Sequence, residues 1–216
     1  MTQAKICGVT TLEAFDAAVE AGAGFIGLVS FPPSPRHLSL DAMEALLAQT
    51  VRDVQIVVLT VDADDAHLEA IQRKVRPDLI QLHGNETPAR AEQVRALTGA
   101  GIIKALAVSE RADLDGLEVW DGAADQLLFD ARPPKGADRP GGLGHRFDWG
   151  LLAGLKLSQP WFLAGGLTPD NVALAIRETA APLVDVSSGV ERAPGVKDTA
   201  LIQAFLDQVR DASPRP

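Results

Sequence analysis

The chain contains a single cysteine, Cys7, among its 216 residues. One thiol cannot form an intramolecular disulfide, so nothing in the cysteine usage indicates an oxidising compartment. Runs of basic residues are also missing: there are 20 Lys and Arg against 29 Asp and Glu, and the formal net charge is −9. We therefore expect neither nucleic acid nor an anionic membrane as a partner, although a small anionic ligand needs only local donors.

Long apolar runs and metal motifs are missing as well. No apolar run approaches the roughly 18 residues that a membrane-spanning helix needs. Glu13, Asp16 and Glu20 interrupt any apolar core of a signal peptide, so we expect a cytoplasmic protein. The four histidines show no ligand spacing, and no zinc or Walker motif occurs. The sequence therefore predicts no metal site.

Eight short, apolar, β-rich runs are present instead, and they begin about 20 to 35 residues apart. They are AKICGV from residue 4, FIGLVS near 25, QIVVLTV near 55, LIQLH near 79, GIIKALAV near 101, QLLFD near 126, WFLAG near 161 and LVDVSS near 183. Most are too apolar for half-exposed strands and suit strands that are covered on both faces. Helical patterns separate them, and three have clear apolar faces: Leu12, Phe15 and Val19; Leu68, Ile71 and Val75; and Ile202, Phe205, Leu206 and Val209.

Strict alternation of strand and helix predicts right-handed crossovers and a parallel sheet. Eight such units favour a single-domain (β/α)8 TIM barrel over residues 1–216. An open doubly wound sheet is the alternative, but the first strand–helix turn has no G-x-G-x-x-G. We expect a short fifth helix within residues 109–125 and a frayed tail at residues 213–216.

Four helix starts have sequence signals. Thr10 and Glu13 have capping-box spacing, Ser39 precedes a helical run, and Pro88 and Pro169 each follow a threonine. In a barrel of this class the functional residues lie at the carboxyl ends of the strands and in the loops that follow.

Cys7 ends the first predicted strand. It is either a small buried core thiol or a reactive thiol whose pKa is lowered by the nearby helix start, and the sequence position favours neither. The loop FPPSPRHLS after the second strand is stiffened by three prolines and carries Arg36. Arg36 suits recognition of a carboxylate or phosphate, or it is a solvated residue of a structural turn.

Asp130 ends the sixth strand after three large apolar residues. Poor solvation there would favour the protonated carboxyl of a general acid, although an aspartate that accepts loop N–H groups is an equal alternative. The following loop, residues 131–146, is rich in Gly and Pro, which is typical of a mobile lid. His83 ends the fourth strand, where it contacts substrate or caps a turn.

Two further loops suit phosphate. They follow the seventh and eighth strands and contain Gly165 and Gly166, then Ser187, Ser188 and Gly189. Glycines let the backbone approach a ligand closely, and the serines offer hydroxyl and N–H donors. Loops after the last two strands form the phosphate site of many such barrels.

Taken in order, these motifs resemble the phosphoribosylanthranilate isomerase family. The motifs are K-I-C-G-V-T, S-P-R, Q-L-H-G, L-F-D, A-G-G-L-T-P-x-N-V and V-D-V-S-S-G-V-E-x-x-P-G-x-K-D. The resemblance runs from Lys5 to about Phe205, and all six motifs fall in order at predicted strand ends. The resemblance implies a TIM barrel of tryptophan biosynthesis that performs an Amadori rearrangement of N-(5′-phosphoribosyl)anthranilate, with neither cofactor nor metal.

The resemblance also implies roles for single residues. Cys7 matches the general base, Asp130 the general acid and Arg36 the residue that meets the anthranilate carboxylate. Because a thiol with its ordinary pKa is a poor base at pH 7, we expect the helix dipole and nearby donors to lower the pKa of Cys7. The residues that match the phosphate-binding loops are Gly165, Gly166, Ser187, Ser188 and Gly189. Asp185 is expected to line the site, and Gly8 to give the loop room to turn over the substrate.

Two alternatives remain open at this point. Another phosphosugar barrel would use the same phosphate loops but would not explain the pairing of Cys7 with Asp130. A catalytically silent phospholigand sensor would use Cys7 as a redox switch. The sequence leaves open whether the chain is a monomer or a homodimer.

Overall fold

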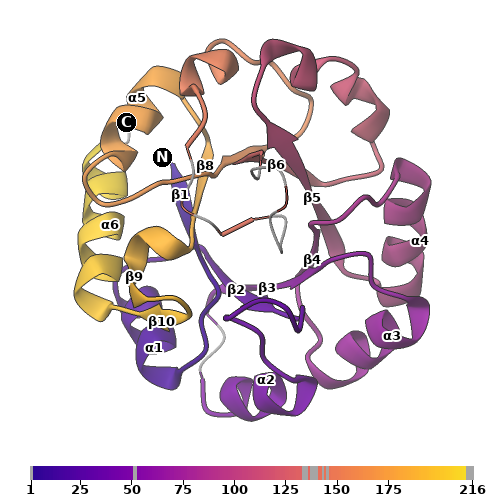
Figure 1. Ribbon diagram of the computed structural model, residues 1–216. Helices are drawn as coiled ribbons and strands as arrows, with labels where there is room; N and C mark the ends of the chain where they lie inside the picture. The colour runs from indigo at the N-terminus through magenta and orange to yellow at the C-terminus, as the bar shows by residue number, and fades with distance from the viewer. Residues whose placement is uncertain are drawn as a thin grey trace.

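The computed structural model describes residues 2–50, 53–132, 136, 141, 142, 144 and 146–212. Eight parallel strands form a closed barrel in which each strand pairs with the next and β8 pairs with β1 (Figure 1). The strands are β1 (Gln3–Cys7), β2 (Phe25–Val29), β3 (Gln55–Thr60), β4 (Leu79–Leu82), β5 (Gly101–Val108), β6 (Gln126–Ala131), β7 (Trp161–Leu163) and β8 (Leu183–Val186). The predicted TIM barrel is confirmed.

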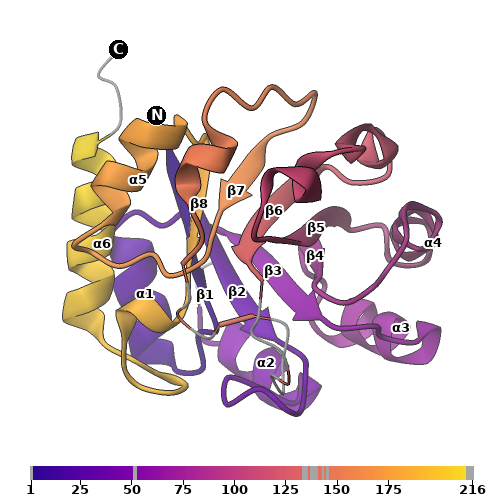
Figure 2. The ribbon, with the colours of Figure 1, turned by 45° about the horizontal axis from the view of Figure 1, so that its top comes forward.

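The helices lie outside the ring of strands, as Figures 1 and 2 show from two directions. The α-helices are α1 (Leu12–Glu20), α2 (Leu40–Leu47), α3 (Asp65–Lys74), α4 (Pro88–Thr98), α5 (Val172–Thr179) and α6 (Thr199–Ala212). Two 3₁₀ helices, η1 (Arg111–Leu114) and η2 (Leu117–Trp120), follow β5, where one short fifth helix was expected. A third, η3 (Trp149–Leu152), precedes β7. No helix in the described part of the chain is long and apolar enough to cross a membrane.

Two predicted helix starts are confirmed and one is shifted. The Ser39 and Thr87 side chains cap α2 and α4 by accepting a backbone N–H three residues later. The cap of α1 is Thr11, not Thr10, because the Thr11 hydroxyl accepts the Ala14 N–H. Thr10 is engaged elsewhere, where its hydroxyl donates to the Gly195 carbonyl.

The predicted helix start at Pro169 is wrong. α5 begins at Val172, and residues 169–171 form a turn. The reason lies in Asn171, whose side chain accepts the Thr168 N–H at 2.8 Å and donates to the Gly166 carbonyl at 2.9 Å. These two bonds hold the loop after β7 in a folded turn and delay the helix by one turn.

Two apolar cores hold the barrel together. One fills the space between strands and helices, and the three predicted apolar helix faces pack into it. The other fills the barrel interior and consists of Phe25, Val57, Leu79, Ile103, Ala105, Leu128, Phe162, Ala164 and Leu183. Within it the rings of Phe25 and Phe162 pack edge to face with centroids 5.2 Å apart. Above these apolar residues the interior becomes polar, with Lys5, Gln81 and Asp185 buried near the carboxyl ends of the strands.

Candidate active site

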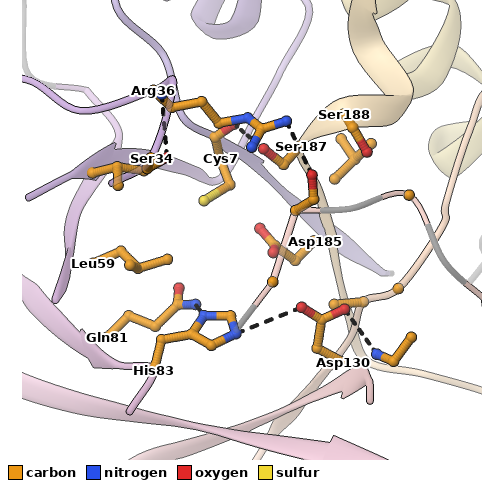
Figure 3. A pocket seen from close by; sticks show the side chains of 18 of the residues that line it. Cys7, Ser34, Arg36, Leu59, Gln81, His83, Asp130, Asp185, Ser187 and Ser188 are labelled. Carbon is orange, nitrogen blue, oxygen red and sulfur yellow. Dashed lines mark hydrogen bonds and ion pairs between the residues drawn. The ribbon is translucent and has the colours of Figure 1, made fainter. Parts of the chain in front are cut away.

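A pocket opens at the carboxyl ends of the barrel strands (Figure 3). Its volume is about 820 Å³, including space open to solvent, which is within the range of about 300–1,000 Å³ typical of small-molecule sites. Nine of the residues singled out in the sequence line it: Cys7, Arg36, His83, Asp130, Gly165, Gly166, Asp185, Ser187 and Ser188. Residues more than 180 positions apart are therefore gathered around one cavity by closure of the barrel.

Cys7 ends β1 with its thiol in the pocket, and the residue is only 4% exposed. Lys5 lies two residues earlier on the same face of β1 and is fully buried. Gly27 on β2 makes room for both side chains, because a Cβ at this position would lie 3.0 Å from both the Cys7 Sγ and the Lys5 Cε. The thiol therefore lies close to a buried ammonium group.

The pKa of Cys7 is raised, which overturns the expectation that it is lowered. Burial is the largest cause, since a thiolate loses its hydration there, and the Asp185 carboxylate adds to the effect. The positive charge of Lys5 acts in the opposite direction, followed by those of Lys197 and Arg36. The nearby cations thus moderate the effect of burial but do not reverse it.

Lys5 organises the polar floor of the pocket. Its Nζ donates to the Gln81 Oε1 at 2.5 Å and to the Asp185 Oδ1 at 3.1 Å. Burial lowers the pKa of Lys5, but the charges and hydrogen bonds of Asp185 and Cys7 more than offset this and raise it. Lys5 therefore stays cationic, and Asp185 is its counter-ion.

Asp130 and His83 face each other on the other side of the pocket (Figure 3). The His83 Nε2 lies 3.5 Å from the Asp130 Oδ2, and the Ala131 N–H donates to Oδ1 at 2.8 Å. The Asp130 side chain is 14% exposed, so the predicted poor solvation is confirmed. The N–H that Asp130 accepts is that of Ala131, which is the last residue of β6, so a hydrogen bond from the loop itself stays a prediction.

Arg36 is 4% exposed, so the alternative of a solvated arginine is wrong. Its Nε and Nη2 donate to the two carboxylate oxygens of Glu191 at 2.7 and 2.8 Å. Nη2 also donates to the Gly142 carbonyl at 3.2 Å. Gly8 has a φ of +76°, and a Cβ there would lie 2.4 Å from the Arg36 Cδ. The glycine after Cys7 thus makes room for the Arg36 side chain.

Glu191 and Lys197 belong to a small antiparallel hairpin after β8, formed by β9 (Glu191–Ala193) and β10 (Val196–Lys197). The Lys197 Nζ donates to Glu191 at 2.8 Å and to the Ser187 carbonyl at 2.9 Å. Burial raises the pKa of Glu191, but its bonds to Arg36 and Lys197 outweigh this and lower it. The carboxylate therefore stays ionised and holds the Arg36 guanidinium in place.

The loops after β7 and β8 also line the pocket. Gly165 and Gly166 have φ values of +82° and +66°, a sharp turn that residues with a Cβ rarely adopt. The Ser187 hydroxyl donates to the Cys7 carbonyl at 3.1 Å. Gly189 is not among the lining residues, and a Cβ there would lie 1.8 Å from the Leu167 carbonyl oxygen. Its glycine is explained by packing, and phosphate binding by Gly189 stays a prediction.

Sequence reasoning missed four residues: Lys5, Gln81, Glu191 and Lys197. All four lie inside the quoted motifs, but the sequence gives no signal of which residue each one contacts in the folded chain. The predicted lid, residues 131–146, lies largely outside the described residues, although Gly141, Gly142 and Gly144 line the pocket. Within the described ranges no group of three or more His, Cys, Asp or Glu could hold a metal ion.

Fold and site together define a (β/α)8 barrel whose pocket combines a thiol, a carboxyl group and a buried arginine. The sequence profile of the family described as N-(5′phosphoribosyl)anthranilate (PRA) isomerase matches residues 4–208. A curated relative from Caulobacter sp. (strain K31), named N-(5′-phosphoribosyl)anthranilate isomerase, is 54% identical over 97% of this chain and 99% of its own length.

Solved structures give the same result. The phosphoribosyl anthranilate isomerase from Thermotoga maritima superposes with a TM-score of 0.87 and is 30% identical over 98% of this chain and 100% of its own. Another phosphoribosyl anthranilate isomerase, solved in complex with reduced 1-(o-carboxyphenylamino)-1-deoxyribulose 5-phosphate, has a TM-score of 0.83 and 29% identity over the same shares. The chain belongs to the N-(5′-phosphoribosyl)anthranilate isomerase family.

Proposed function

We propose that this chain isomerises N-(5′-phosphoribosyl)anthranilate to 1-(2-carboxyphenylamino)-1-deoxyribulose 5-phosphate, a step of tryptophan biosynthesis, with Cys7 as general base and Asp130 as general acid. The observation that carries the residue roles is their placement: the two groups come from β1 and β6 and line one pocket (Figure 3). The two alternatives, another phosphosugar barrel and a silent phospholigand sensor, do not explain why Cys7 and Asp130 line the same pocket.

The reaction needs an acid first. Protonated Asp130 delivers its proton to the furanose oxygen, the bond between C1′ and that oxygen breaks, and the nitrogen lone pair forms a cationic imine at C1′. The carboxylate that Asp130 becomes then accepts the Ala131 N–H, which lies 2.8 Å from Oδ1 in the structure. A buried donor that is already in place stabilises charge as it develops.

The base acts second. The Cys7 thiolate removes the proton from C2′ and becomes a thiol, the C–H electron pair forms the C1′–C2′ double bond, and the imine nitrogen becomes neutral. The resulting enolamine gains a proton at C1′ and loses the C2′ hydroxyl proton to give the ketone. Burial raises the pKa of Cys7 in the free protein, but a cationic imine beside the thiol favours the thiolate when it is needed.

The substrate's two anionic ends have separate binding groups. The Glu191 carboxylate accepts hydrogen bonds from Nε and Nη2 of Arg36. Nη1 is therefore the guanidinium nitrogen that does not bond to Glu191. We assign Arg36 to the anthranilate carboxylate and the loops around Gly166 and Ser188 to the 5′-phosphate. Backbone N–H groups of glycine turns suit a phosphate because glycine has no side chain to keep the phosphate away from the backbone.

Composition and the burial of Cys7 support proposals about the domain organisation, the localisation and the partners of the chain. We infer a single domain over residues 1–216 that works in the cytoplasm as a monomer or homodimer, with a small-molecule substrate and no role for nucleic acid, membrane, metal or cofactor. The tail at residues 213–216 lies outside the described residues. Burial of Cys7 and its raised pKa count against the alternative of a redox sensor, because exposed thiolates are the readily oxidised ones.

Fluorescence-monitored turnover tests this function. The purified chain is mixed with freshly made N-(5′-phosphoribosyl)anthranilate, and the decay of its fluorescence is compared with the spontaneous decay in buffer. We expect rapid, enzyme-dependent consumption with formation of the ketose product. A trace that matches the buffer control would favour a silent phospholigand sensor.

A further inference from the structure

Gln81 and His83 lie two positions apart at the carboxyl end of β4, and both line the pocket (Figure 3). Gln81 is fully buried, and its amide group has two polar neighbours. The Lys5 Nζ lies 2.5 Å from Oε1, and the His83 Nδ1 lies 3.0 Å from Nε2. A buried amide with a cation on one side and an imidazole on the other has only one arrangement that satisfies all of the groups.

Lys5 determines which way the Gln81 amide faces. An ammonium group only donates hydrogen bonds, so the Gln81 atom beside it must be the carbonyl oxygen. The NH2 group, which also only donates, then faces His83. Nδ1 of His83 must therefore accept, and in a neutral imidazole the proton is then carried by Nε2.

We propose that Gln81 is a positioning residue that locks His83 in the Nε2–H tautomer, so that His83 donates to Asp130. The donor and acceptor already face each other, since Nε2 lies 3.5 Å from the Asp130 Oδ2. Such contacts are often long in the free protein and shorten when charge develops on the acceptor.

The catalytic consequence rests on the proposed function. When Asp130 gives its proton to the substrate, a carboxylate forms between two N–H groups, from His83 and from the Ala131 backbone. The other His83 tautomer would turn a nitrogen lone pair toward that carboxylate and repel it. Lys5 and Gln81 thus act on the acid through the orientation of one proton on His83.

Nitrogen NMR of the free protein tests the lock directly. The chain is labelled with ¹⁵N-histidine, and the His83 signals are assigned by their loss in His83→Gln. We expect a protonated Nε2 and an unprotonated Nδ1 at neutral pH. A protonated Nδ1 in the parent protein would overturn the proposal, and this result depends neither on turnover nor on the folding of a variant in position 81.

Gln81→Glu tests the cause. One oxygen of the new carboxylate can still accept from Lys5. The other oxygen replaces the NH2 group that faced the His83 Nδ1, so Nδ1 must now donate. If His83 switches to the Nδ1–H tautomer, Asp130 loses the Nε2–H donor. If the His83 ring instead becomes doubly protonated, its positive charge holds Asp130 as a carboxylate, which has no proton to give. We expect Nδ1 to become protonated and kcat to fall about 10- to 100-fold, with KM within about two-fold.

The matched control is Gln126→Glu, at the amino end of β6 and away from the pocket. It should leave both the His83 signals and kcat unchanged. An unprotonated Nδ1 or an unchanged kcat in Gln81→Glu would overturn the role of Gln81. If the parent protein shows the predicted tautomer but does not consume N-(5′-phosphoribosyl)anthranilate, the proposed function fails and the tautomer lock stands.

Discussion

The Lys5 Nζ lies 3.1 Å from the Asp185 Oδ1 inside the barrel, and the two residues are separated by 180 positions in the chain. They meet because β1 and β8 are paired in register, with Lys5 opposite Asp185. Removing one partner of a buried ion pair typically costs about 3–5 kcal/mol, because the other charge is left without compensation. The pair therefore holds a positive charge beside Cys7 that the protein cannot easily lose.

Replacing Lys5 with Met should raise the pKa of Cys7 further, because its main opposing cation is gone. The thiolate fraction at a fixed pH below the pKa then falls about ten-fold for each pKa unit, and kcat/KM should fall with it. Ultraviolet titration of the thiolate measures this cleanly, since the chain has one cysteine and no tyrosine. The Cys7→Ser variant, which has no thiol, gives the baseline absorbance for this titration.

Lys74→Met, at a lysine on α3 that pairs with Asp41 at the surface, is the matched control and should leave the titration unchanged. In the parent protein kcat/KM should rise with pH above neutrality, because a base with a raised pKa becomes a thiolate only there. A Cys7 titration in Lys5→Met that overlays the parent curve would show that Lys5 does not act on the thiol.

Glu191→Gln should loosen Arg36 and weaken substrate binding. The neutral amide cannot accept both Nε and Nη2 from Arg36, so one of two charge-assisted hydrogen bonds is lost. We expect KM to rise about ten-fold with a smaller change in kcat, and a larger rise for Arg36→Met. Steady-state kinetics measures both. Glu178→Gln on the exposed face of α5 is the control, and an unchanged KM in Arg36→Met would remove Arg36 from the site.

Glu86 supports the loop that follows His83. Its carboxylate accepts the Asp62 and Gly84 N–H groups at 2.9 Å and the buried Lys104 Nζ at 2.7 Å. Glu86→Gln leaves the Lys104 charge buried without its partner, so the free energy of unfolding should fall by about 3–5 kcal/mol at pH 7. Urea unfolding measures it, and Glu69→Gln on the exposed face of α3 should have little effect.

The same carboxylate makes stability depend on pH. Burial raises the pKa of Glu86, but the bonds from Lys104 and the backbone N–H groups outweigh it and hold the pKa below the ordinary value of 4.5. The stabilisation is therefore present above pH 4.5 and is lost as the pH falls through the folded-state pKa. Over that acid range Glu86→Gln should lose less stability than the parent protein, and parallel curves would contradict this assignment.

The sequence identified most of the pocket because a closed parallel barrel brings the ends of all its strands to one face. Cys7, His83 and Asp130 needed only a strand end to be recognised, whereas Asp185 was expected from the family resemblance alone. Arg36 needed a loop motif, and its burial beneath the hairpin after β8 could not be read from the loop alone. Each of these residues can be recognised from its local sequence, and the barrel topology determines that they line one pocket.

What the sequence could not provide is the pairing of buried charges. Lys5 sits in an apolar strand, and its partners Gln81 and Asp185 become neighbours only when the barrel closes. The pKa of Cys7 was predicted in the wrong direction for a different reason: the thiol is buried in the folded chain, and burial outweighs the nearby cations. The late start of α5 depends on the Asn171 side chain, which folds back on its own loop.

The pairing of Cys7 with Asp130 is tested most directly by single-turnover kinetics of Cys7→Ala and Asp130→Asn, alongside calorimetric binding of the reduced product analogue to each. We expect each variant to lose at least about 100-fold in turnover while it binds the analogue within a few-fold of the parent protein. Turnover within about ten-fold of the parent protein in either variant, with binding intact, would contradict the assignment of base and acid.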